Sequence, residues 1–75
     1  MTLDQLAVGQ EAIVRTVGGE GALRTRLLDM GVIPGTRIRV TRRAPLGDPI
    51  ELHLRGYVLT LRQEDAKAVE LEAIP

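Results

Sequence analysis

The residues able to do chemistry gather in one stretch, RRAPLGDPIELHLRGYVLTLR, which covers residues 42–62. It contains the only histidine of the chain, His53, with Glu51 two positions before it and Asp48 close by in the sequence. Side chains two positions apart on a β-strand point to the same face, so His53 and Glu51 are candidates for an acid–base pair. The chain has no serine and no cysteine, which excludes a hydroxyl or thiol nucleophile of the Ser–His or Cys–His kind. A solvated polar face of a hairpin explains these residues better, because a core this small leaves little room for a catalytic pocket, and we predict that the chain is not an enzyme.

The same three side chains are also the candidates for a metal site. An imidazole nitrogen with carboxylate oxygens from Glu51 or Asp48 suits a weak site for a divalent transition metal. A dedicated site needs three or four converging ligands, and one histidine with loose carboxylates falls short of that number. We therefore expect no cofactor and no built-in metal site, and keep His53, Glu51 and Asp48 as weak candidates. An adventitious or oligomer-bridging zinc ion remains an alternative.

Arginine is the second chemical signal of this region. Six arginines and two acids fall within residues 37–62, although the whole chain has a formal net charge of zero. This local excess favours a protein partner with an acidic surface over nucleic acid, which requires many neutralised phosphates and, for single strands, aromatic platforms. Tyr57 is the only aromatic residue. We predict partner binding through the arginines and through a tight loop between them, with these residues: Arg37, Arg39, Arg43 and Arg55 for charge, and Leu46, Gly47, Asp48 and Pro49 for the shape of the loop.

The strand before this loop is predicted by strict alternation. In residues 36–43, TRIRVTRR, the apolar Ile38 and Val40 alternate with polar side chains. Ile38 and Val40 should face the core, and the other side should carry Arg37, Arg39, Thr41 and Arg43.

A β-hairpin is predicted after the loop, over residues 50–54 and 57–61. If Arg55-Gly56 is a two-residue turn, one face carries three pairs of apolar residues: Leu54 with Tyr57, Leu52 with Leu59, and Ile50 with Leu61. A slip of one residue would destroy this sorting, so the register is well specified. Gly47 should adopt a positive φ, and Asp48 should accept hydrogen bonds from nearby backbone N–H groups, which together make the loop stiff.

The remaining elements complete a small, mainly β domain. Residues 10–17 predict a strand with Ala12 and Val14 on one side and Val17 on the other, and residues 68–74 predict a last strand with Val69, Leu71 and Ala73 inward. Residues 22–30 predict a helix that buries Leu27, with short helical turns near Leu3 and over residues 63–67. Five short strands in 75 residues favour one strongly bent barrel whose open end is covered by the helix between the first and second strands. We expect a single domain over residues 1–75.

The location of the chain is predicted from what its sequence lacks. No apolar run approaches the length of a membrane span, and MTLDQLAVGQ has no basic start or long apolar stretch of a signal peptide. With no cysteine, the chain has no sign of a secreted disulfide scaffold. We expect a cytoplasmic protein that does not insert into the membrane.

Three segments together resemble a known family. LRTRLLDMGVIPGTRIRV, RRAPLGDPIEL and RGYVLTLR are similar, in order, to the motifs of the FeoA family of bacterial ferrous iron transport. The resemblance covers nearly the whole chain, from about Leu3 to Leu71, and departs at Gln10, where the family usually has Glu. It implies a small SH3-like barrel with a helical insertion. It also implies a role beside the membrane transporter FeoB, whose cytoplasmic part is a GTPase domain.

Two functional hypotheses follow from the residues and the resemblance. The first is an accessory or regulatory module that docks on the cytoplasmic region of the FeoB-type transporter. The alternative is a transition-metal-linked regulatory domain like the C-terminal SH3-like domain of iron-dependent repressors, with His53 as its most plausible ligand. Whether docking activates or inhibits transport, and whether the chain associates weakly with itself, stay open.

Overall fold

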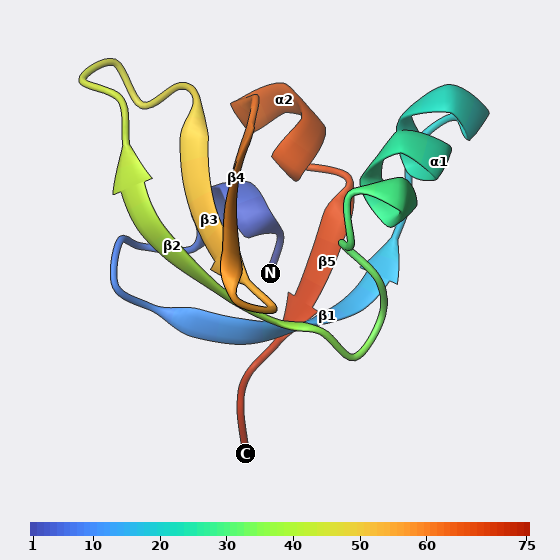
Figure 1. The fold of residues 1–75 in the computed structure, drawn as a ribbon, viewed down its shortest axis with the longest axis horizontal. Helices are drawn as coiled ribbons and strands as arrows, with labels where there is room; N and C mark the ends of the chain where they lie inside the picture. The colour runs from blue at the N-terminus through green and yellow to red at the C-terminus, as the bar shows by residue number, and fades with distance from the viewer.

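A computed structural model describes all of residues 1–75 and places five strands in one antiparallel sheet (Figure 1). Along the sheet the strand order is β4-β3-β2-β1-β5. The mainly β fold and the position of the helix between the first two strands are confirmed. The elements are a 3-10 turn η1 (Leu3–Gln5), β1 (Glu11–Val17), α1 (Gly21–Asp29), β2 (Arg37–Arg43), β3 (Ile50–Leu54), β4 (Tyr57–Leu61), α2 (Gln63–Ala66) and β5 (Val69–Glu72).

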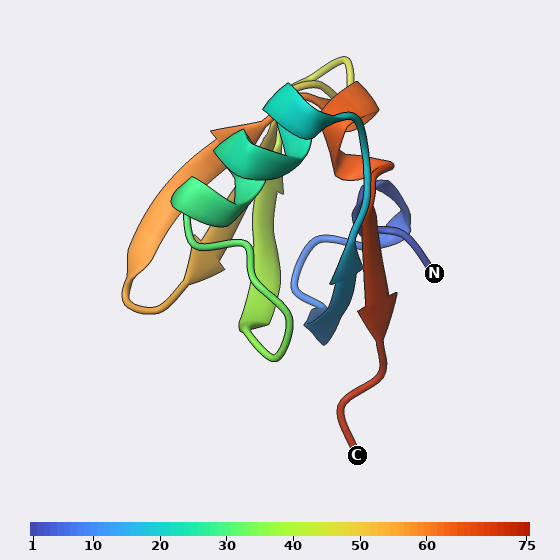
Figure 2. The same ribbon diagram turned by 90° about the vertical axis from the view of Figure 1, so that its right-hand side faces the viewer.

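The sheet is strongly bent rather than flat. Figure 2 shows β3 and β4 on one side, β1 and β5 on the other, and the two helices near the same end of the molecule. Register shifts between Val14 and Thr16 and between Val40 and Arg42 mark irregularities of the bulge type, which increase local twist. No hydrogen-bonded ladder joins β4 to β5, so the barrel stays partly open. The edge of β5 is covered by the N-terminus, because the Leu71 N–H donates to the Met1 carbonyl at 2.7 Å.

The bulge in β1 corrects one expectation about the core. Val17 was expected on the face opposite Ala12 and Val14, but all three are buried in the same hydrophobic cluster. The extra residue between Val14 and Thr16 resets the alternation, so the last residue of β1 turns inward. The expectation that Ala73 faces inward is also wrong, since β5 ends at Glu72 and Ala73 is exposed.

The β3–β4 hairpin has the predicted register. Ile50 pairs with Leu61, Leu52 with Leu59 and Leu54 with Tyr57. Arg55 and Gly56 have φ values of 48° and 83°, and two positive φ angles are the requirement of a type I′ turn. The apolar sorting of the strands therefore overrides the steric cost of a left-handed arginine.

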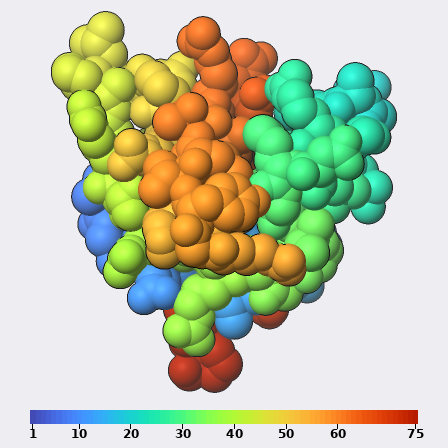
Figure 3. Space-filling model, viewed as in Figure 1, coloured from blue at the N-terminus to red at the C-terminus, as the bar shows by residue number.

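Tyr57 fastens the hairpin to the end of α1. Tyr57 is 41% exposed, and its hydroxyl donates a hydrogen bond to the carbonyl of Met30. Figure 3 shows the hairpin (orange) and the segment around the end of α1 (green) in contact on one face. Gly31 follows with a φ of 97°, and a Cβ there would collide with the Tyr57 hydroxyl. Both the helix end and the close contact therefore require glycine.

The core is an aliphatic cluster of 16 buried residues enclosed by the bent sheet and by α1. Leu27 of α1 is 0% exposed, and Leu23 and Leu28 of the same helix pack against the cluster together with Met30, which caps the helix. This agrees with the helical spacing in the sequence. No helix in the structure has the length and apolar character that crossing a membrane would need.

Replacing Leu27 by Ala should lower the free energy of unfolding by about 2–5 kcal/mol, the range for a truncated buried leucine. Small domains have on the order of 5–15 kcal/mol in total, so the variant should be partly unfolded at physiological temperature. Thermal unfolding followed by circular dichroism measures this, with Thr25→Ala as the control because Thr25 is exposed on the same helix. Equal melting temperatures for the two variants would show that α1 does not pack as described.

Candidate functional site

The residues expected to bind a partner lie in two places. Arg37 starts β2 and Arg43 ends it, so the strand separates the Arg55-Gly56 turn from the loop of residues 44–49. In Figure 1 this loop (yellow) lies at the upper left, and the β3–β4 turn (orange) lies lower, at the opposite end of these strands. The structure therefore does not bring the predicted residues into one compact patch.

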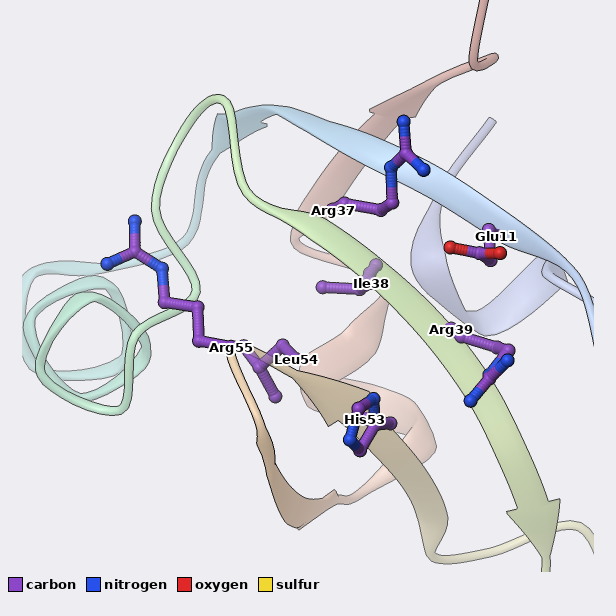
Figure 4. A pocket seen from close by; sticks show the side chains of 7 residues that line it. All are labelled: Glu11, Arg37, Ile38, Arg39, His53, Leu54 and Arg55. Atoms are coloured by element: carbon purple, nitrogen blue, oxygen red, sulfur yellow. The ribbon is translucent and has the colours of Figure 1, made fainter.

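The first place is the outer side of β1, β2 and β3, which we call the basic face and define by Arg37, Arg39 and His53. The register pairs Glu11 with Arg39 and Arg39 with His53, so these three side chains form one row across the sheet. Together with Arg37 they line an open depression of about 320 Å³ (Figure 4). Its remaining lining residues are Ile38, Leu54 and Arg55.

The charges of the basic face are not neutralised within the chain. The two ion pairs of the structure join the N-terminal amine to Glu70 and Arg26 to Asp65, and neither involves Arg37 or Arg39. Glu11 lies in the same depression but makes no ion pair with either guanidinium. Two arginines are therefore available to an anionic group from outside.

Arg55 also lines the depression, but its guanidinium is hydrogen-bonded to another part of the chain. Its Nη2 donates to the Thr36 hydroxyl at 3.2 Å, and Thr36 is only 4% exposed. Figure 4 shows its guanidinium directed away from Arg39 and His53. Arg55 thus forms the predicted turn and also satisfies a buried polar group, and the contact with Thr36 was not predictable from the sequence.

The second place is the β2–β3 loop, which is held by backbone and side-chain hydrogen bonds. The Ala44 N–H donates to Pro49 O at 3.1 Å and the Gly47 N–H donates to Ala44 O at 2.7 Å. Gly47 has the predicted positive φ, 87°. Asp48 Oδ1 accepts from the Gln63 N–H of α2 at 2.9 Å, so its partner is distant in sequence rather than local as expected.

Leu46 is the exposed apolar tip of this loop, at 95% exposure. The hydrogen bonds around it fix the path of the backbone, so the side chain is presented by a shaped turn. An apolar side chain held in this way can fill a pocket on a partner at a low cost in entropy.

Arg43 was expected to face solvent, and this is wrong. Its Nη2 donates to the carbonyls of Asp4 and Leu6, both at 2.7 Å. The register shift between Val40 and Arg42 breaks the alternation of β2 and turns Arg43 toward η1, while Arg42 becomes exposed. Arg43 therefore fixes the N-terminal segment, and its carbonyl contacts were not readable from the sequence.

A model of the FeoA domain matches residues 1–73 of the chain. The chain belongs to the FeoA family. One relative is the Fe(2+) transport protein A/Fe(2+) transporter FeoB fusion protein of Porphyromonas gingivalis, 40% identical over 99% of this chain. The chain spans 9% of the length of that relative. The resemblance read from the three sequence motifs is thus confirmed, and the family is linked to ferrous iron transport.

Solved structures of FeoA proteins have the same fold. The FeoA protein of Chlorobium tepidum is 40% identical, with a TM-score of 0.92 over 100% of this chain and 71% of that one. The FeoA of Stenotrophomonas maltophilia complexed with zinc, described as an SH3 domain protein, is 28% identical with a TM-score of 0.85, over 96% and 89% of the two chains. ScaR with bound zinc, 24% identical over 99% of this chain and 37% of that one, has a TM-score of 0.85 and shows only the shared fold. The SH3-like fold is confirmed.

The zinc-bound FeoA raises the question of whether this chain has suitable ligands. Glu51 Oε2 accepts from the Thr41 hydroxyl at 3.0 Å, and Asp48 binds the α2 backbone. No group of three or more His, Asp or Glu side chains comes together anywhere in the chain. His53 lies beside Arg39 instead, and a neighbouring guanidinium disfavours a cation. The three weak candidates, His53, Glu51 and Asp48, are therefore not brought together within one chain.

Replacing Arg43 by Ala should lower the free energy of unfolding by about 1–3 kcal/mol, because two carbonyl acceptors lose a charged donor. Arg42→Ala is the matched control: Arg42 is exposed, so its removal should change stability by about 0.5 kcal/mol or less. Urea unfolding of both variants measures the difference. If both are equally stable, the contacts of Arg43 with η1 do not hold the N-terminal segment.

Proposed function

We propose that residues 1–75 act as one docking module, a cytoplasmic accessory or regulatory protein of bacterial ferrous iron transport. Its partner is the cytoplasmic GTPase region of an FeoB-type transporter, and it performs no catalysis. The observation that carries the proposal is the basic face, where Arg37 and Arg39 have no internal partner. The fusion of an FeoA segment to FeoB in a relative supports the choice of partner.

A partner domain that uses both candidate places must span the length of β2. The strand has seven residues, and at a rise of about 3.3 Å per residue its ends lie about 20 Å apart. The basic face would supply charge complementarity at one end. The loop from Leu46 to Pro49 would supply an apolar contact at the other end. A folded domain, rather than a short peptide, meets this requirement.

The alternative is a metal-linked regulatory domain, and the FeoA of Stenotrophomonas maltophilia complexed with zinc supports it. It would use His53 as a ligand, with further ligands from outside the chain. A titration followed by NMR separates the two functions. The transporter's cytoplasmic domain should shift the resonances of Arg37, Arg39 and Leu46, whereas ferrous ion alone should shift His53 and its neighbours if the alternative holds.

Reversing two charges should weaken docking without unfolding the protein. We expect Arg37→Glu with Arg39→Glu to weaken binding of the transporter domain at least tenfold and to flatten its salt dependence. Stability should change little, because exposed charges contribute little to folding. The matched control is Arg15→Glu with Lys67→Glu, which changes the net charge equally at two exposed basic residues outside both the depression and the loop. Equal losses in both double variants would reduce the effect to net charge and contradict docking through the basic face.

His53→Ala tests the metal-linked alternative. The fold and the support of transport should be largely retained, because one imidazole is not a metal site. Complementation of a strain that lacks its own FeoA measures the function, and circular dichroism checks the fold. A folded variant that fails to complement would favour the metal-linked function.

A further inference from the structure

The two free arginines of the basic face have a regular spacing. Arg37 and Arg39 are two positions apart on β2, so their side chains leave the same face about 6.6 Å apart along the strand. Any extended chain places alternate side chains on one face at the same interval. An extended segment with acids at alternate positions therefore matches the spacing of the two guanidinium groups.

The backbone around the depression argues for carboxylates over phosphate. Phosphate sites usually draw on free backbone N–H groups at a helix N-terminus or in a nest. Here the lining residues lie inside a paired sheet: Ile13 pairs with Arg37, Ile38 with Leu54, and Arg39 with His53. Only side chains are available above this surface. A guanidinium in this situation pairs best with a planar carboxylate, through two parallel hydrogen bonds.

The neighbours of the two arginines set the side from which an acid can approach. Glu11 pairs with Arg39 on the β1 side and would repel a carboxylate placed there. On the other side, the row continues from His53 to Val58 of β4, which is 55% exposed. Acids can therefore enter over β3, while an apolar side chain of the same segment contacts Val58.

We propose that the basic face recognises an extended acidic segment of a partner protein in which two carboxylates are separated by one residue. Arg37 and Arg39 each take one carboxylate, and Glu11 excludes segments whose acids extend over β1. This deepens the docking proposal and rests on it only for the identity of the partner. The chain carries such a pair itself in Glu70 and Glu72, but Glu70 is occupied by the N-terminal amine at 3.2 Å.

Two capped synthetic peptides of identical composition test the spacing. In TVEVEVT the acids alternate and share a face, whereas in TVVEEVT they are adjacent and point to opposite faces of an extended chain. Each peptide is titrated into the isotope-labelled protein at low salt and followed by NMR, with inorganic phosphate as a third probe. We expect the alternating peptide to bind at least fivefold more tightly than the adjacent one, with shifts at Arg37, Arg39 and His53, and phosphate to give no saturable binding.

The charge variants complete the test. Arg37→Glu with Arg39→Glu should abolish the difference between the peptides, and Arg15→Glu with Lys67→Glu should retain it. If the first variant does not fold, Arg37→Gln with Arg39→Gln takes its place. Equal binding of the two peptides, no binding at millimolar concentration, or phosphate binding as tight as that of the peptide would overturn the proposal. So would shifts that depend on protein concentration alone, since the occupant would then be a second copy.

The outcomes also separate this inference from the docking proposal. If the transporter domain shifts the basic face but the peptides do not differ, docking stands and the recognition of spaced carboxylates fails. If the peptides differ but the transporter domain does not bind, the recognition of spaced carboxylates stands and the docking proposal fails.

Discussion

The alternation along β2 links the hydrophobic core to the basic face. Ile38 and Val40 are buried, and a strand cannot bury them without placing Arg37 and Arg39 on its other side. Because β2 is the central strand of five, its register is held by neighbours on both sides. The free energy of burying the two aliphatic side chains thus also orients the two guanidinium groups. A register slip of one residue would turn the arginines toward the core and the aliphatic side chains toward solvent.

The alternation of apolar and polar residues was sufficient to predict the strand register where one face is buried and the strands are regular. The pairs of Ile50, Leu52 and Leu54 across the hairpin were predictable because apolar sorting leaves one acceptable register. It failed where a bulge interrupts the alternation, as at Val17 and Arg43. The position of a bulge depends on how neighbouring strands fit a bent sheet, and a single strand's sequence does not contain that information. The partners of Arg55 and Asp48 depend likewise on tertiary contacts, with Thr36 and Gln63.

Four arginines that lie within seven residues of the sequence therefore have different structural roles. Arg37 and Arg39 remain free on the basic face, Arg42 is exposed near the loop, and Arg43 binds the carbonyls of η1. Arginine suits the last role because its planar group can donate several hydrogen bonds while its aliphatic part stays packed. The number of arginines in this segment therefore overstates the positive charge that is accessible on the surface. Only the structure distinguishes Arg43, which is bonded within the chain, from the exposed arginines.

The energetics of exposed charges limit what the basic face can do alone. An exposed ion pair contributes about 0.2–1 kcal/mol, so two such pairs fall well short of the roughly 4 kcal/mol that a millimolar dissociation constant represents. Contacts that exclude water, such as one with Val58 or Leu46, must supply the rest. In a covalent fusion, the effective concentration of the second domain reaches the millimolar range, and contacts this weak are then enough for docking. Under the proposed docking, a module fused to its partner and a free chain would therefore place different demands on the basic face, and a free chain would depend more on the loop at the other end of β2.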